Sequence, residues 1–117
     1  FVRDPRLGGW RLSPLYDVVP RPGMAYERYL HLEVGQQGKL ATLDNALSAY
    51  ARFDLERPDA VALMARVARQ VQQWRACFEE HGASGGLIDQ LAPAFRVLDE
   101  VASPALRQAL EQAAPAP

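Results

Sequence analysis

The chain has 117 residues, of which 49% are hydrophobic and 23% are charged, and its formal net charge is -1. These values are ordinary for one globular domain, and a nearly neutral chain gives no electrostatic reason to expect a nucleic acid or an anionic membrane as partner. No apolar run is long enough for a membrane span or a signal peptide, and the single cysteine, Cys77, excludes an internal disulfide. We therefore expect a cytoplasmic protein.

The first element in chain order is a β-hairpin. Residues 4–9, Asp-Pro-Arg-Leu-Gly-Gly, combine proline and glycine as hairpin turns do, and apolar residues flank them on both sides. Trp10 and Leu12 alternate with a charged residue, which is the period of a half-buried strand, and Pro14 ends that strand. Because Phe1 already belongs to the hairpin, we expect the chain to be a fragment that begins inside it.

Asp17 follows the hairpin and is the first candidate functional residue. A carboxylate just beyond a strand end is well placed to bind a metal ion, because the strand fixes the backbone while the loop leaves the side chain free. The alternative is a turn residue whose carboxylate caps a local backbone N–H. Its neighbour Tyr16 either lines a ligand pocket or packs with its hydroxyl group at the surface.

A β-segment and a short helix come next. Residues 29–34 alternate between polar and apolar types, which predicts a short strand or β-arm ended by the glycines of 35–38. Thr42 is a good N-cap for a helix over 43–52. We expect Phe53 to fold back onto the apolar face of that helix.

The longest predicted element is an amphipathic helix over 58–81. Pro58 suits its first turn, and Gly82 suits its C-terminal end. His81 is expected to favour the helix C-terminus through the helix dipole. Cys77 is expected to be a small buried residue among aromatic neighbours.

Further helices complete the chain. Ser84 is a candidate N-cap for a helix over 85–98, which Pro93 must kink or interrupt. Ser103, followed by proline, begins a short last helix, and residues 115–117 are expected to be disordered.

The fold class predicted from these elements is mainly α: a helical bundle with a small N-terminal β-hairpin or β-arm. Residues 1–41 form the β and loop segment, and residues 42–114 supply the helices. The residues expected in the core are Leu43, Leu47, Tyr50, Val61, Met64, Val71, Trp74, Phe78, Ile88, Leu91 and Phe95.

Several motifs carry a resemblance to a kinase family. The segment Gly-Trp-Arg-Leu-Ser-Pro-Leu-Tyr-Asp-Val-Val-Pro, residues 9–20, resembles the segment with which HipA-like serine/threonine kinases present their magnesium-binding aspartate. Further segments resemble the C-terminal helical part of the same family, and they follow its order. These segments are Leu-His-Leu-Glu-Val-Gly at 30–35, Ala-Thr-Leu-Asp-Asn-Ala-Leu-Ser at 41–48, Trp-Arg at 74–75 and Leu-Ala-Pro-Ala-Phe at 91–95. The likeness covers residues 8–96.

The resemblance implies a role for each candidate residue. Asp17 binds the Mg²⁺ that bridges the phosphates of ATP, and Tyr16 lines the nucleotide pocket. The sequence has Asp-Val-Val where ordinary protein kinases have Asp-Phe-Gly, and this departure is shared with the HipA-like group. A glycine-rich phosphate loop, a strand lysine and a catalytic-loop base are missing from the 117 residues, so we expect the chain alone to be inactive.

The resemblance also implies partners. These are the remaining N-terminal part of the kinase, a protein serine or threonine substrate, and a DNA-binding antitoxin that restrains the kinase as the toxin of a type II toxin–antitoxin system. Direct nucleic-acid binding by this chain is not expected. The competing interpretation is a non-enzymatic helical interaction module or a degenerate kinase remnant, whose apolar faces serve a partner.

Overall fold

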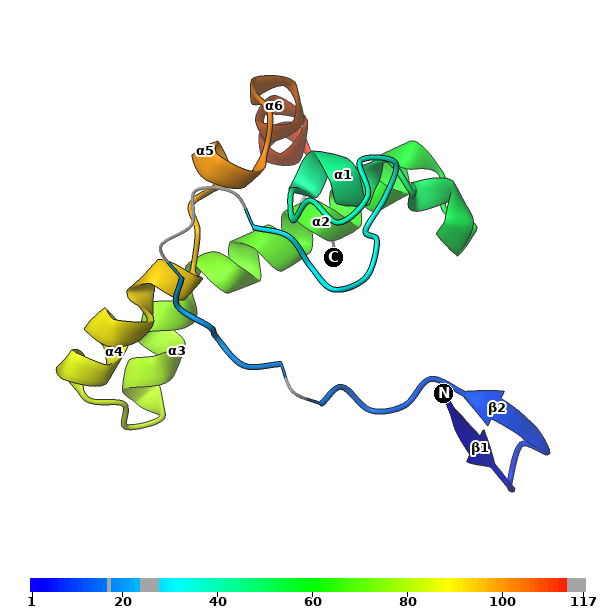
Figure 1. Cartoon of the computed structure of the whole chain (residues 1–117), viewed down its shortest axis with the longest axis horizontal. Helices are drawn as coiled ribbons and strands as arrows, with labels where there is room; N and C mark the ends of the chain where they lie inside the picture. The colour runs from blue at the N-terminus through cyan, green and yellow to red at the C-terminus, as the bar shows by residue number, and fades with distance from the viewer. Residues whose placement is uncertain (17, 24–27, 114–117) are drawn as a thin grey trace.

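The architecture is that of a mainly α protein with a small antiparallel β-sheet at its N-terminus, as the sequence predicts (Figure 1). The computed structural model describes residues 1–16, 18–23 and 28–113. The helices are α1 (Leu43–Leu47), α2 (Arg57–Gln72), α3 (Trp74–Glu80), α4 (Gly85–Leu91), α5 (Leu98–Val101) and α6 (Pro104–Gln112), with 3-10 turns η1 (Tyr50–Phe53) and η2 (Ala92–Ala94). The predicted disorder of 115–117 lies outside the described residues. Within those that are described, no helix has the length and apolar character that crossing a membrane requires.

The predicted hairpin is present, but its apolar face is not buried. Strands β1 (Val2–Asp4) and β2 (Gly9–Arg11) pair antiparallel, and the Asp4 carboxylate accepts the Arg6 N–H across the turn at 3.0 Å. Trp10 and Leu12 are 71% and 73% exposed, so the expectation of a half-buried strand is wrong within this chain. The reason is that none of the described helices covers the two-stranded sheet, which projects away from them (Figure 1).

The β-segment after residue 28 forms isolated bridges rather than the predicted strand. Tyr29 pairs with Leu40 and Gly35 pairs with Gly38, each as a single antiparallel bridge. Some backbone groups of this loop bond to the side chain of Asn45 in α1 instead of to a neighbouring strand. Its Nδ2 group donates to the carbonyl oxygens of Gly38 and Leu40 at 2.9 and 2.8 Å, and its Oδ1 atom accepts the Gln37 N–H at 2.8 Å.

Asn45 is completely buried, with 0% of its surface exposed. All of its amide hydrogen-bonding groups have partners, which is the condition under which a polar side chain is stable in a core. The loop lies so close that a Cβ atom on Gly35 would fall 1.9 Å from the Asn45 carbonyl oxygen. Only glycine fits at that position.

Helix α1 begins as predicted and ends earlier. The Thr42 hydroxyl accepts the Asn45 N–H at 3.2 Å and caps the helix. The Ser48 hydroxyl donates to the Asn45 carbonyl at 2.6 Å, and the Ala49 N–H bonds to Ala46 instead of continuing the α-helical ladder. The helix therefore stops at Leu47 rather than at residue 52. Phe53 is exposed and does not fold back onto α1.

The predicted helix over 58–81 is two helices. Pro58 lies in the first turn of α2 as expected, but the chain leaves helical geometry at Gln73, with φ −88° and ψ 9°. After this break the Trp74 ring stacks on Phe95 at 4.1 Å, and Phe78 meets both rings edge-on at 5.6 and 5.8 Å. This aromatic cluster holds α3 against the chain that follows α4.

Helix α3 ends at a glycine, as predicted. Gly82 has φ +80°, the Ala83 N–H donates to the Phe78 carbonyl at 2.9 Å, and the Gly82 N–H donates to Glu79 at 3.0 Å. This paired arrangement is the Schellman motif that commonly closes helices. The expected burial of Cys77 is wrong, because its side chain lies on the exposed face of α3.

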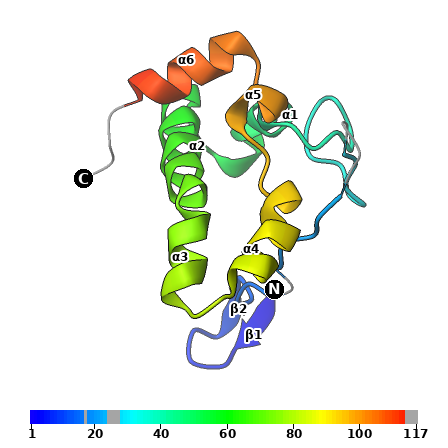
Figure 2. The ribbon, with the colours of Figure 1, turned by 90° about the vertical axis from the view of Figure 1, so that its left-hand side faces the viewer.

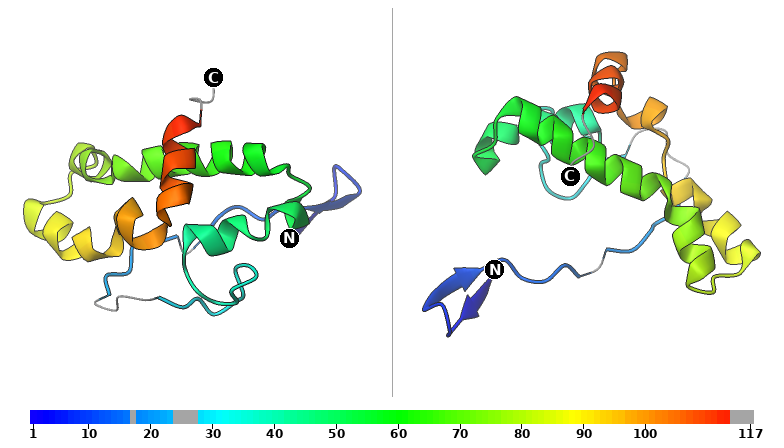
Figure 3. Two further views of the ribbon diagram at one scale, coloured as in Figure 1. Left: turned by 90° about the horizontal axis from the view of Figure 1, so that it is seen from above. Right: turned by 180° about the vertical axis from the view of Figure 1, so that it is seen from behind.

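The core lies where α6 packs across α2, with α1 alongside (Figures 2 and 3). Its buried members are Leu47, Ala60, Val61, Ala65, Ala102, Leu106 and Leu110. Ile88 is also buried, as predicted, whereas Val71 is 45% exposed and does not join the core.

The last helices follow the local signals. The Ser84 hydroxyl accepts the Leu87 N–H at 3.3 Å at the start of α4, and Pro93 interrupts the predicted helix over 85–98 as expected. The Ser103 hydroxyl accepts the Leu106 N–H at 3.3 Å at the start of α6.

A long-range contact joins α1 to α6. Ser103 donates to the Asp44 carboxylate from its N–H at 2.7 Å and from its hydroxyl at 2.6 Å, across a separation of 59 residues. Hydrogen bonds to a charged group contribute about 1.5–3 kcal/mol each. The N-cap of α6 is thus held by α1.

We expect Gly35→Ala to lower the free energy of unfolding by about 3 kcal/mol, because the added methyl group must displace the α1 backbone. Urea denaturation followed by circular dichroism measures the change. Gly86→Ala is the matched control: its methyl group meets open space in α4 and should leave stability within about 1 kcal/mol of the unsubstituted chain. Equal effects of the two substitutions would contradict the close approach at Gly35.

Candidate functional site

The sequence-predicted site lies on the N-terminal arm, which we define as residues 1–16 and 18–23. Beyond β2 the described part of the arm has no helix or strand and runs as an extended chain towards the helices (Figure 1). Tyr16 is 78% exposed on this chain. Asp17 lies outside the described residues. Tyr16 therefore belongs to the arm and not to the helical body.

The arm exposes many large apolar side chains. Each of these is at least 59% exposed: Phe1, Leu7, Trp10, Leu12, Leu15, Tyr16, Val18 and Val19. Single exposed apolar residues are normal, but a contiguous group of this size usually marks a surface that binds another polypeptide. None of them belongs to the core formed by α1, α2 and α6.

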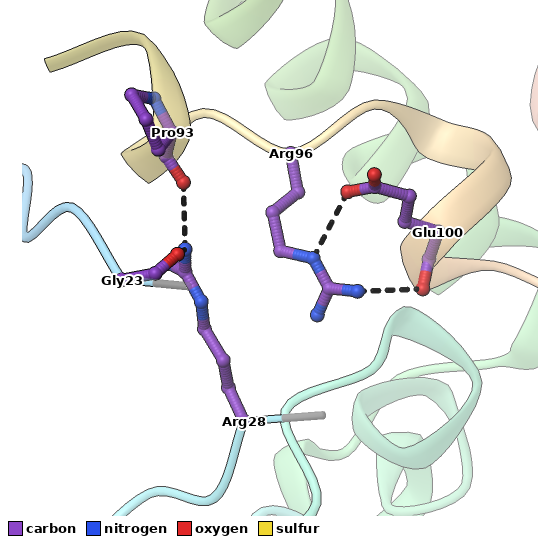
Figure 4. Close-up of polar contacts among 5 residues, drawn as sticks. All are labelled: Gly23, Arg28, Pro93, Arg96 and Glu100. Atoms are coloured by element: carbon purple, nitrogen blue, oxygen red, sulfur yellow. Dashed lines mark hydrogen bonds and ion pairs between the residues drawn. The ribbon is translucent and has the colours of Figure 1, made fainter. Parts of the chain in front are cut away.

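Arg28 attaches the base of the arm to the helical body. Its Nη2 group donates to the Gly23 carbonyl at 3.0 Å and to the Pro93 carbonyl at 2.6 Å (Figure 4). Arg96, two residues past η2, holds Glu100 through its carboxylate at 3.1 Å and its carbonyl at 3.3 Å (Figure 4). The base of the arm is thus joined to η2 by a contact across 65 residues that no local sequence pattern reveals.

Among the described residues, no three His, Cys, Asp or Glu side chains lie close enough together to hold a metal ion. Magnesium needs few protein ligands, because it keeps several waters and is commonly bound by one or two carboxylates together with substrate phosphates. A single carboxylate can therefore serve a magnesium site as one ligand among several.

The two histidines of the chain lie far apart in the sequence, one at a helix end and one in a loop. His81 lies at the C-terminal end of α3, as predicted, with its Nδ1 atom 2.7 Å from the Cys77 carbonyl oxygen. His31 is exposed in the loop before Gly35.

Comparisons of the chain with protein-family models, with curated proteins and with solved structures find no match. The function is therefore argued from the residues of this chain.

We expect amide hydrogen exchange to separate the arm from the body. The core helix α2 should be strongly protected, whereas residues 1–12 should exchange fast, because a two-stranded sheet without a covering layer opens readily in water. Protection at 1–12 that rises with protein concentration would indicate pairing with a second copy through the free strand edges. Uniform, concentration-independent protection from residue 1 onward would contradict this division of the chain.

Proposed function

We propose that the chain is the C-terminal helical part of a HipA-like protein kinase, which transfers phosphate from ATP to a serine or threonine of a protein. In this proposal the fragment supplies the magnesium-binding Asp17 and the helical lobe, and Tyr16 lines the nucleotide pocket. The remaining N-terminal part of the kinase supplies the catalytic base and the phosphate-binding loop. A DNA-binding antitoxin and a cytoplasmic location belong to the same proposal.

The observation that carries the proposal is the contrast between the arm and the body. The helices bury a core of their own, yet the arm that bears the family-like segment leaves its large apolar residues exposed. Such an arm suits a chain whose N-terminal segment packs on another lobe. Packing there would place the backbone around Tyr16 between the two lobes, which is where kinases bind the nucleotide.

In the complete kinase, a magnesium ion held at Asp17 would neutralise the charge that develops on the transferred phosphate. The role of this chain would be to position the magnesium ion. The Asp17 carboxylate would hold one side of the ion, and the Arg28 contact to Gly23 and Pro93 would fix the base of the segment that carries it.

The exposed arm also favours a second function, a non-enzymatic interaction module, because an apolar segment of this kind suits any partner with a complementary surface. The coding sequence upstream of Phe1 discriminates the two. An in-frame catalytic loop with its histidine and aspartate supports the kinase, whereas a stop codon between that loop and Phe1 supports the module.

We expect the isolated 117-residue chain neither to hydrolyse ATP nor to transfer its phosphate, because the base and the phosphate loop are missing from it. Incubation with Mg-ATP and a generic acceptor protein, followed by phosphate release and autoradiography, tests this. Reproducible turnover that is abolished by a substitution in this chain would show that the chain is catalytically complete.

In the longer protein that contains the chain, Asp17→Asn should lower phosphotransfer at least about 100-fold, because asparagine is nearly isosteric but lacks the charge that binds magnesium. The melting temperature should change little. Asp89→Asn is the matched control, since the Asp89 side chain is 81% exposed and has no part in the proposed site. Unchanged activity of Asp17→Asn at the normal magnesium concentration would exclude the metal-binding role.

A further inference from the structure

A concave surface unrelated to the arm lies between α2, α5 and α6. Its volume is about 370 Å³, at the lower end of the roughly 300–1,000 Å³ typical of small-molecule sites. The floor is apolar and consists of Ala65 and Ala68 of α2, Leu98 of α5 and Leu110 of α6. Ala65 and Leu110 are only 2% and 4% exposed, so the floor is continuous with the core and is held in place by it.

The rim of this cleft carries opposite charges on facing helices. Arg69 and Gln72 stand on α2, and Glu111 stands on α6. In the part of the chain that the structure describes, neither Arg69 nor Glu111 makes an ion pair or a side-chain hydrogen bond. Among the described residues, the two charged groups thus have no ion-pair partner beside the apolar floor.

We propose that this cleft binds a small zwitterion with an apolar side chain, of the class of the aliphatic and aromatic α-amino acids. The ligand carboxylate pairs with the Arg69 guanidinium, which presents a planar fork of donors suited to it. The ligand ammonium group pairs with the Glu111 carboxylate, and the apolar side chain covers the floor formed by α2, α5 and α6. Gln72 supplies a neutral donor and acceptor beside Arg69.

Charge complementarity selects a zwitterion over other small ligands. A purely anionic ligand would meet the repulsive carboxylate of Glu111, and a purely cationic one would meet Arg69. A neutral apolar ligand would leave both charges unused. The volume of about 370 Å³ favours a single small molecule over a peptide segment or a helix. This proposal uses no residue of the arm, so it stands or falls separately from the kinase proposal.

The test is a titration of the ¹⁵N-labelled 117-residue chain with L-leucine, followed by nuclear magnetic resonance. We expect saturable shifts of the amide signals of residues 65–72 and 107–112, with a Kd on the order of 1 mM, as befits a ligand with few heavy atoms. L-leucinamide, which lacks the carboxylate, and 4-methylpentanoate, which lacks the ammonium group, should each bind at least about 10-fold more weakly.

Substitutions assign the two charges. Arg69→Gln and Glu111→Gln should each weaken L-leucine binding at least about 10-fold, and both residues are exposed, so the variants should fold normally. Arg66→Gln is the matched control, because Arg66 is an exposed arginine of the same helix that does not line the cleft. It should leave the titration unchanged.

Three results would overturn the proposal. The first is the absence of saturable shifts, and the second is equal binding of L-leucine and 4-methylpentanoate. The third is that shifts of the same residues appear on raising the protein concentration without ligand, which would mean that a second copy covers the cleft.

Discussion

The buried side-chain amide of Asn45 is the contact around which the helical body is assembled. It holds the loop before α1 by donating to the carbonyl oxygens of Gly38 and Leu40. The backbone carbonyl of the same residue accepts the Ser48 hydroxyl and lies close against Gly35. Since an unpaired amide at full burial costs several kcal/mol, the loop cannot leave without destabilising α1. Any rearrangement of this loop therefore disturbs α1, and any rearrangement of α1 disturbs the loop.

The neighbouring Asp44 extends this constraint to the end of the chain. Its carboxylate binds the backbone and hydroxyl of Ser103, so one short helix fixes both the loop before it and the N-terminus of α6. Helix α6 in turn covers α2 and completes the core. By contrast, Arg28 links the base of the arm to this body through the Gly23 and Pro93 carbonyls, and no described residue of the arm belongs to the core. The two parts are thus built differently: the body encloses its apolar surface, and the arm presents it.

The two proposed sites therefore lie on different parts of the molecule. The kinase proposal rests on residues of the arm, which need a partner surface, whereas the zwitterion proposal rests on a cleft whose floor the body has already made rigid. A partner that covers the arm and a ligand that fills the cleft would touch different elements.

Features that depend on a few consecutive residues were determined by the sequence alone. Thr42, Ser84 and Ser103 cap the helices that they were predicted to cap, and Gly82 and Pro93 end or interrupt theirs, because each acts on backbone groups within four residues of itself. The fold class followed from those signals and from the apolar periodicity. The position of Tyr16 beyond a hairpin was also predictable, but its surroundings were not. Features that depend on residues distant in sequence were decided by the tertiary structure. They include the helix break at Gln73, which accompanies the stacking of Trp74 on Phe95, and the burial of Asn45. The attachment of the arm by Arg28 and the exposure of Trp10 belong to the same group. Alternating or helically spaced apolar residues show that one face of a strand or helix is apolar. They do not show whether that face is buried, because the covering surface comes from elsewhere in the folded chain or from another molecule.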